Sequence, residues 1–174
     1  MAVRKIVYAP APVLKEVCKA VEQVDARVQT LMDDMLETMY AARGIGLAAN
    51  QIGETDRVIV VDVADSDSEE KPAPLLMANP EVIWTSEELS SYNEGCLSLP
   101  EQYADVERPA AVRVRYLDRT GTTQELDADG LLATCIQHEI DHLNGVLFVD
   151  YLSKLKRGMV MKRLKKVLSQ REDA

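Results

Sequence analysis

The spacing of apolar residues predicts an amphipathic helix near each end of the chain. Between residues 27 and 43 the apolar side chains recur three and four positions apart, which places them on one face of a helix. Gly44 follows this segment and is expected to end the helix. A final amphipathic helix is expected over residues 153–169. Its apolar side consists of Leu155, Met159, Val160, Leu164 and Val167 or Leu168.

Apolar and β-branched runs predict strands in the middle of the chain. Residues 57–63 have the sequence RVIVVDV, which favours a buried strand. Extended segments follow at residues 75–79 and 81–84. Pro80 is expected to separate them, because proline cannot donate a hydrogen bond to a strand ladder. The polar and acidic residues 64–74 predict a surface loop before these strands.

The last predicted strands form a hairpin. Residues 111–117 and 123–126 alternate apolar and polar side chains, and the Asp-Arg-Thr-Gly sequence at 118–121 is typical of a turn. Residues 146–151 are expected to form a short extended piece. The order of elements is therefore helix, mixed strands, helix, helix, which predicts the α+β class.

A central helix is expected to pack on this sheet. It opens at Asp129 or Gly130, runs to about Leu143, and is closed by Asn144 and Gly145, because glycine commonly follows a helix end. This helix also carries both histidines of the chain. Its apolar surface consists of Leu131, Leu132, Cys135, Ile136 and Ile140.

Length and composition indicate a single domain over residues 1–174. The chain can bury one sizeable core, and 47% hydrophobic with 28% charged residues is typical of globular proteins. It lacks an apolar run of about 18 residues, which excludes a membrane-spanning helix. Residues 1–14 lack the continuous apolar core of a secretory signal, so the protein is expected to be cytoplasmic. The three cysteines argue against a disulfide framework.

Charge is distributed unevenly along the chain. The net charge is −9, which disfavours binding of DNA or other nucleic acid by the body of the protein. Residues 153–174 nevertheless carry eight basic and two acidic side chains, a net charge of +6, against −15 for the preceding residues. This basic C-terminal segment indicates either an anionic partner or a solvated helix face.

The only two histidines of the chain stand four residues apart. The sequence His138-Glu139-Ile140-Asp141-His142 lies in the central helix, so both imidazoles share one face, one turn apart. Such a pair can bind one metal ion, and the glutamate can act as a general base on metal-bound water. The alternative is a helical turn with two polar surface histidines, which these five residues alone do not exclude.

A catalytic metal site of this kind needs a third protein ligand. The chain has no third histidine, and the only glutamate after His142 is Glu172, near the C-terminus. A cysteine is the better candidate, because a thiolate is a strong ligand for a divalent metal. Cys96, which follows Gly95 and precedes an extended segment, is favoured. Cys135 is the competitor, but its place on the apolar stripe suits a buried filler.

Three segments together resemble the signature motifs of the peptide deformylase family. They are residues 44–51 (GIGLAANQ), 94–98 (EGCLS) and 137–143 (QHEIDHL), and the resemblance extends over essentially the whole chain. It implies the α+β deformylase fold, of the bacterial type with a helical C-terminus, in which antiparallel sheets surround a central metal-binding helix. It also implies an enzyme that removes the formyl group from the N-terminal formyl-methionine of newly made proteins and releases formate.

The resemblance also implies a metal centre. By motif position its ligands are Cys96, His138 and His142, with water as the fourth, and Glu139 is the general acid/base acting on that water. The expected ion is Fe²⁺, and zinc, nickel or cobalt can occupy the same site. A ligand set of one cysteine and two histidines is compatible with iron or zinc.

The same resemblance assigns residues that stabilise the intermediate and bind the substrate. The Gln51 side-chain amide and the Leu97 backbone N–H are the expected donors to the oxyanion. Without the motif, Gln51 would be interpreted as a surface amide in a glycine-rich loop. The substrate is expected to bind by strand addition. Its candidate contacts are Ile45, Gly46 and the segment 96–99, and for the methionine pocket Leu131, Thr134 and Cys135.

Three further residues are interpreted through the family. Glu94 and Arg108 resemble a buried ion pair that supports the cysteine loop, and the alternative is two unrelated surface charges. Tyr103 stands where some relatives carry an arginine that contacts the substrate backbone, so peptide affinity is expected to differ. The implied partners are nascent formyl-methionyl polypeptides and, through the basic C-terminal helix, the ribosome.

Two other functions stay open at this stage. A different metal hydrolase, such as an endopeptidase, could use the same histidine helix, although Cys96 as the third ligand counts against it. A non-catalytic member of the fold, acting as a binding module, would be marked by loss of Glu139 or Gln51, and both are present.

Overall fold

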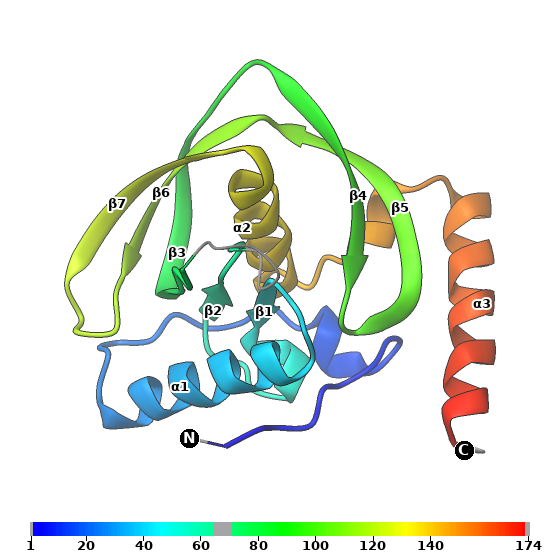
Figure 1. Ribbon diagram of the computed structural model, residues 1–174, viewed down its shortest axis with the longest axis horizontal. Helices are drawn as coiled ribbons and strands as arrows, with labels where there is room; N and C mark the ends of the chain where they lie inside the picture. Colours follow the sequence, from blue (N-terminus) through cyan, green and yellow to red (C-terminus); the bar gives the residue numbers. More distant parts are fainter. Residues whose placement is uncertain (1, 65–70, 173–174) are drawn as a thin grey trace.

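The computed structural model describes residues 2–64 and 71–172, and within them two antiparallel sheets surround a central helix (Figure 1). The larger sheet has the order β1-β2-β3-β6-β7, and the smaller one pairs β4 with β5. This arrangement confirms the α+β class. The strands are β1 (Gly46–Ala48), β2 (Val58–Val61), β3 (Leu75–Thr85), β4 (Leu89–Cys96), β5 (Leu99–Pro109), β6 (Ala111–Leu117) and β7 (Thr123–Asp129).

The central helix α2 (Gly130–Leu143) and the first helix α1 (Ala26–Ala41) cover opposite faces of β2. Successive side chains of a strand point to opposite faces. Ile59 and Val61 therefore join the core cluster of α2, whereas Val58 and Val60 join the core cluster of α1. All four side chains are buried, which confirms the buried strand predicted at residues 57–63.

The end of α1 differs from the prediction. Gly44 was expected to stop the helix, but Arg43 is the residue in the left-handed conformation, with φ of +58°. The Arg43 N–H donates to the Tyr40 carbonyl oxygen at 3.0 Å, and the Gly44 N–H donates to the Met39 oxygen at 2.9 Å. The helix therefore ends at Ala41, two residues before its predicted end, and an arginine occupies the position after the cap where glycine is usual.

Pro80 does not divide β3, and the prediction of two separate strands there is wrong. The strand continues through the proline because the register against β6 shifts between Ala78 and Glu81. Asn79 has a φ of +50° at this irregularity. A bulge accommodates a residue that cannot donate to the ladder.

The hairpin of β4 and β5 was not predicted as a pair of strands. Its exposed positions include Leu89 and Tyr103, and its buried positions include Gln102 and Arg108, so its sequence lacks a clear apolar alternation. Residues 146–151 were expected to be extended, but Phe148–Tyr151 form a 3₁₀ turn, η3. The β6–β7 hairpin and the bounds of α2 agree with the prediction. Of the predicted surface loop at 64–74, residues 65–70 lie outside the described part.

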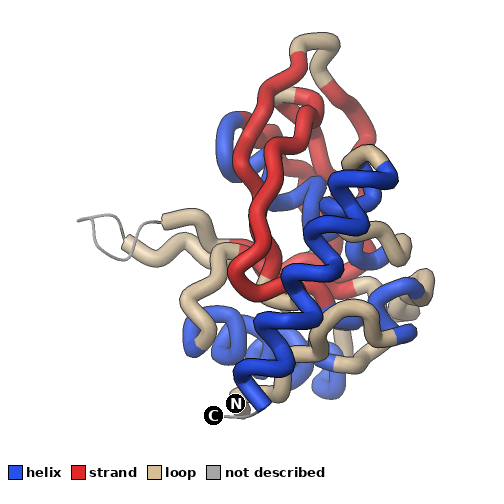
Figure 2. The backbone as a smooth tube through the Cα atoms, turned by 90° about the vertical axis from the view of Figure 1, so that its right-hand side faces the viewer, coloured by secondary structure: helices blue, strands red, loops and turns tan. Residues whose placement is uncertain are grey.

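The C-terminal helix α3 (Lys154–Glu172) lies along the β4–β5 hairpin, as the second view shows (Figure 2). Val160 and Leu164 are its buried anchors. Leu155 and Met159, placed on its apolar side by the sequence pattern, are 75% and 52% exposed, so that part of the prediction is wrong. Within residues 2–64 and 71–172, the helices are too short or too polar to span a membrane.

Candidate active site

Helix α2 and the end of β4 bring together three side chains that could bind a metal ion. His138 and His142 lie one turn apart on α2, and their Nε2 atoms are 3.1 Å apart. Cys96 ends β4, and its Sγ lies 3.3 Å from His142 Nε2. One ligand atom from each of the three lies within 4.8 Å of the others. Both histidines are buried, so they are not surface residues.

The donor set and its spacing fit one small divalent ion. With bonds of about 2.0–2.1 Å to nitrogen and about 2.3 Å to sulfur, a tetrahedral ion separates its ligand atoms by roughly 3.3–3.6 Å. The nitrogen–nitrogen and sulfur–nitrogen separations of 3.1 and 3.3 Å are close to this range. Cys135, the competing cysteine, does not belong to the cluster formed within the described residues. Its Sγ lies 3.5 Å from the Ile45 carbonyl oxygen instead.

A network of charged and polar side chains lies behind His138. His138 Nδ1 is 2.9 Å from Glu94 Oε1, and Arg108 donates to both Glu94 oxygens at 2.7 and 3.0 Å. Arg108 also donates to Asp141 Oδ2 at 2.7 Å, and the Tyr151 hydroxyl donates to the same oxygen at 2.7 Å. Glu94 and Arg108 are both buried, which excludes the interpretation as unrelated surface charges. Sequence reasoning missed Asp141 and Tyr151.

Burial and hydrogen bonding shift the pKa values of two carboxylic acids near this cluster in opposite directions. Burial raises the pKa of Glu139 to about 7, and the nearby His138 offsets only part of this effect. Burial also acts to raise the pKa of Glu94, but hydrogen bonds with His138 and Arg108 outweigh it, and the pKa is lowered. Glu139 can therefore exchange a proton near neutral pH, whereas Glu94 stays charged.

The Gln51 side chain is fixed at both ends of its amide. Its Oε1 accepts a hydrogen bond from the Ala48 N–H at 2.9 Å, and its Nε2 donates to Ser98 Oγ at 3.1 Å. The same Nε2 lies 3.4 Å from Cys96 Sγ. Gln51 is buried in the 3₁₀ turn η2 (Ala49–Ile52), so the alternative of a surface amide is wrong. Sequence reasoning placed Ser98 only within the segment 96–99 of expected substrate contacts, whereas in the structure its hydroxyl helps to orient this amide.

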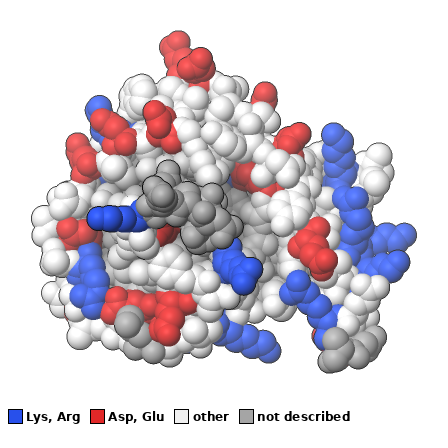
Figure 3. Space-filling view, viewed as in Figure 1, with Lys and Arg blue, Asp and Glu red and all other residues white. Residues whose placement is uncertain are grey.

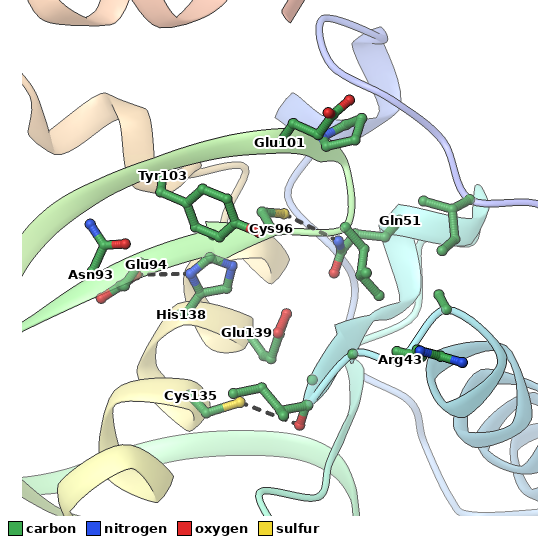
Figure 4. A pocket seen from close by; sticks show the side chains of 18 of the residues that line it. Arg43, Gln51, Asn93, Glu94, Cys96, Glu101, Tyr103, Cys135, His138 and Glu139 are labelled. Carbon is green, nitrogen blue, oxygen red and sulfur yellow. Dashed lines mark hydrogen bonds and ion pairs between the residues drawn. The ribbon is translucent and has the colours of Figure 1, made fainter. Parts of the chain in front are cut away.

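These groups surround one open cavity of about 630 Å³ (Figure 4). Figure 4 shows Cys96, His138, Glu139 and Gln51 gathered around it, from β4, α2 and η2. Of the segment 96–99, only the first two residues line the cavity. The other proposed substrate contacts that line it are Ile45, Gly46, Leu131, Thr134 and Cys135.

Two further residues line the cavity, Tyr103, which the sequence analysis had considered, and Arg43, which it had not. Tyr103 on β5 is 63% exposed, and its ring lies against Gly95, where a Cβ would be 2.5 Å from the ring Cε1. Arg43 lines the cavity from the loop after α1 (Figure 4). The apolar pattern of residues 27–43 predicted a helix but did not indicate that Arg43 would line a cavity.

A cluster of two buried histidines and a partly buried cysteine, beside a carboxylic acid and an open cavity, defines an enzyme with a candidate metal centre. Comparison with known proteins identifies its family. Residues 3–158 match the family model described as polypeptide deformylase. The chain belongs to the peptide deformylase family.

Relatives and solved structures agree over nearly the whole length. The peptide deformylases of Mesorhizobium japonicum and Bradyrhizobium diazoefficiens are each 58% identical, over 96% and 99% of this chain and 94% and 100% of those proteins. A crystal structure of peptide deformylase from Ehrlichia chaffeensis has a TM-score of 0.92 at 40% identity, covering 99% of both chains. A second structure from that organism, in complex with actinonin, has a TM-score of 0.90 at 41% identity, covering 95% and 98%.

Proposed function

We propose that this enzyme hydrolyses the N-terminal formyl group from the formyl-methionine of newly synthesised polypeptides and releases formate. The observation that carries the proposal is the convergence of Cys96, His138, His142, Glu139 and Gln51 around one open cavity. The names of the relatives and the actinonin complex of a related deformylase support the same reaction. The cytoplasm, where nascent chains emerge, is the proposed compartment.

Cys96, His138 and His142 are the proposed ligands of one divalent ion. Fe²⁺ is the expected ion, and zinc, nickel or cobalt can take its place. Such an ion supplies a Lewis acid for the formyl carbonyl and lowers the pKa of water. The chain contributes the ligand geometry, because α2 fixes the spacing of the histidines. Glu94 beside Nδ1 of His138 orients that ring so that its Nε2 faces His142 and Cys96.

Glu139 is the proposed general acid and base. Its side chain lines the cavity, and its buried Oε1 has no hydrogen-bond partner among the described residues. Because burial raises its pKa to about 7, the carboxylate can take a proton from the attacking water near neutral pH. It then gives that proton to the amine as the C–N bond of the formamide breaks and formate leaves.

Gln51 and the backbone N–H of Leu97 are the proposed donors to the oxyanion of the tetrahedral intermediate. Gln51 adds no charge, and its contacts with Ala48 and Ser98 hold the amide in place before the reaction. Its Nε2 is 3.4 Å from Cys96 Sγ, so it lies beside the reacting carbon of a substrate held at the cluster. Preorganised donors of this kind contribute about 100- to 1,000-fold to acyl-transfer rates.

The substrate is proposed to bind as an extended strand between two unpaired strand edges. Among the described strands, β1 pairs only with β2, and β4 pairs only with β5. Both β1 and β4 contribute residues to the cavity wall, so a peptide can add between them. Ile45 and Gly46 would contact one side of the peptide, and Leu97 the other. The methionine side chain would contact Leu131, Thr134 and Cys135.

Formate release tests the proposal directly. Metal-loaded protein prepared without oxygen should release formate from formyl-Met-Ala-Ala and leave the unformylated peptide uncut. Glu139→Ala should lower kcat by at least about 100-fold, the usual share of a general acid/base, while its metal content stays that of the wild type. Near-full activity in this variant would refute the mechanism. Cleavage of internal peptide bonds would indicate an endopeptidase instead.

A further inference from the structure

Arg43 holds a backbone conformation that disfavours a side chain. Its φ of +58° and the hydrogen bonds from the N–H groups of Arg43 and Gly44 to Tyr40 and Met39 form a Schellman motif. Glycine is the usual residue at the position that Arg43 occupies, because it adopts a left-handed conformation without strain. Residues in such conformations cluster at functional sites, so the Arg43 side chain is a candidate for a function.

The Arg43 side chain lies on the wall of the cavity and is exposed (Figure 4). Among the described residues, its guanidinium has no hydrogen-bond or ion-pair partner. Two acidic side chains that line the same cavity are already paired. Glu94 binds Arg108, and Glu101 lies 3.7 Å from Arg171. Within residues 2–64 and 71–172, Arg43 is therefore a positive charge without an acidic partner, and it lines the cavity that a ligand would enter.

The backbone from Gly46 back to Arg43 leads from the reaction centre toward solvent. A Cβ on Gly46 would lie 2.6 Å from Glu139 Oε2, so Gly46 marks the inner end of this segment. Ile45 and Gly44 follow, and Arg43 is exposed at the other end of this segment. An extended peptide advances about 3.3 Å per residue, as the protein strand beside it does. A substrate whose first residue lies beside Gly46 and Ile45 therefore reaches Arg43 with its third residue.

We propose that Arg43 is a specificity-determining residue that favours an acidic side chain at the third residue of the substrate. The inference rests on the proposed deformylase function and adds a preference that the reaction itself does not require. A guanidinium binds a carboxylate through charge-assisted, frequently bidentate hydrogen bonds. A lysine at the same substrate position meets a like charge instead.

Two formylated peptides of opposite charge measure this preference. They are formyl-Met-Ala-Asp-Ala-amide and formyl-Met-Ala-Lys-Ala-amide, whose amidated ends remove the terminal carboxylate. The wild type should show a kcat/KM about three- to five-fold higher for the aspartate peptide at low salt, the effect of one exposed ion pair. Arg43→Gln should bring this ratio close to one, and Arg43→Glu should invert it. Added salt should weaken both the wild-type preference for the aspartate peptide and the inverted preference of Arg43→Glu.

Arg113→Gln is the matched control, because it removes one positive charge from β6, whose Arg113 is not part of the cavity wall. It should keep the wild-type ratio. If the Arg43 variants also keep that ratio and change only the melting temperature, Arg43 acts on the C-terminus of α1 and the inference is wrong. A charge preference at the second residue, in formyl-Met-Asp-Ala-Ala-amide, would also refute it. Wild-type protein that releases no formate from any of these peptides would overturn the proposed function itself.

Discussion

Gly46 on β1 packs closely against helix α2 in the candidate site. A Cβ at this position would lie 2.6 Å from Glu139 Oε2 and 2.8 Å from Cys135 Sγ. Atoms of real side chains do not come this close, so either β1 or the Glu139 carboxyl would have to move. Position 46 therefore needs a glycine because of this close packing. Its φ is not positive, so the backbone conformation does not require a glycine.

Gly46→Ala is expected to lower kcat on a formylated peptide by roughly 100-fold, because a displacement of about 1 Å in a reacting group has an effect of that size. Gly158→Ala on α3 is the matched control, since a Cβ there meets nothing within 4 Å. The control should keep full activity and gain about 0.5–1 kcal/mol of stability from the better helix former. Full activity in Gly46→Ala would show that the close approach is not needed for the reaction.

Individual site residues differ in how far the sequence could predict them. His138 and His142 could be found from their spacing alone, because positions four apart share a helix face wherever the helix packs. Arg43 and Tyr151 could not, because their surroundings come from elements that are distant in the chain. Asp141 lies inside the histidine motif, yet only the fold shows that it faces Arg108.

At the scale of elements, one hydrogen-bond network joins four of them behind the metal-ligand cluster. Glu94 comes from β4, Arg108 from β5, Asp141 from α2 and Tyr151 from η3. Glu94 also contacts Nδ1 of His138, so the network orients a proposed ligand. Mutation of groups that fix the orientation of a ligand typically lowers metal affinity by about 10- to 100-fold.

Glu94→Gln is expected to weaken metal binding by about 10- to 100-fold. The amide lacks the charge that pairs with Arg108, and it presents a weaker partner to His138 Nδ1. Transfer of the metal to a competing chelator, followed at constant pH, measures the affinity without using activity. Glu107→Gln is the control, because Glu107 is an exposed acid on the same hairpin. Equal metal affinity in both variants would mean that Glu94 does not support the ligand.

The elements that were predicted correctly are those whose apolar residues recur at the period of the helix or strand and face the core. α1, α2, β2 and the β6–β7 hairpin each place apolar residues at the period of their structure. The β4–β5 hairpin was missed because it packs against α2 and α3 and buries polar side chains such as Gln102 and Arg108. Pro80 was wrongly predicted to separate two strands, because the bulge that accommodates it is not specified by the local sequence.

At the scale of the whole molecule, charge is separated between the body and the C-terminal helix. Basic side chains gather over α3 at the right of Figure 3, whereas acidic side chains are spread over the rest of the visible face. The helix is attached through Val160 and Leu164, which pack with Val106 and Phe148. Deleting α3 would therefore expose apolar core residues, so substitutions on its surface are a cleaner test of the proposed ribosome contact.

Changing Lys162, Lys165 and Lys166 to glutamine is expected to weaken ribosome binding and to reduce its salt dependence. Each lost phosphate contact lowers the slope of log affinity against log salt by about 0.7–0.9, so three contacts would lower it by about two to three. All three lysines are exposed, so the melting temperature should not change. Co-sedimentation with ribosomes over a salt series measures the slope.

The matched control for this variant replaces three exposed lysines outside α3, namely Lys5, Lys19 and Lys71, with glutamine. Both triple variants have the same net charge, so the general electrostatic attraction to RNA is equally reduced in both. A larger loss in the α3 variant would assign the contact to this helix. Equal losses would show that only net charge matters, and unchanged binding in both would leave the basic face of α3 as a solvated surface.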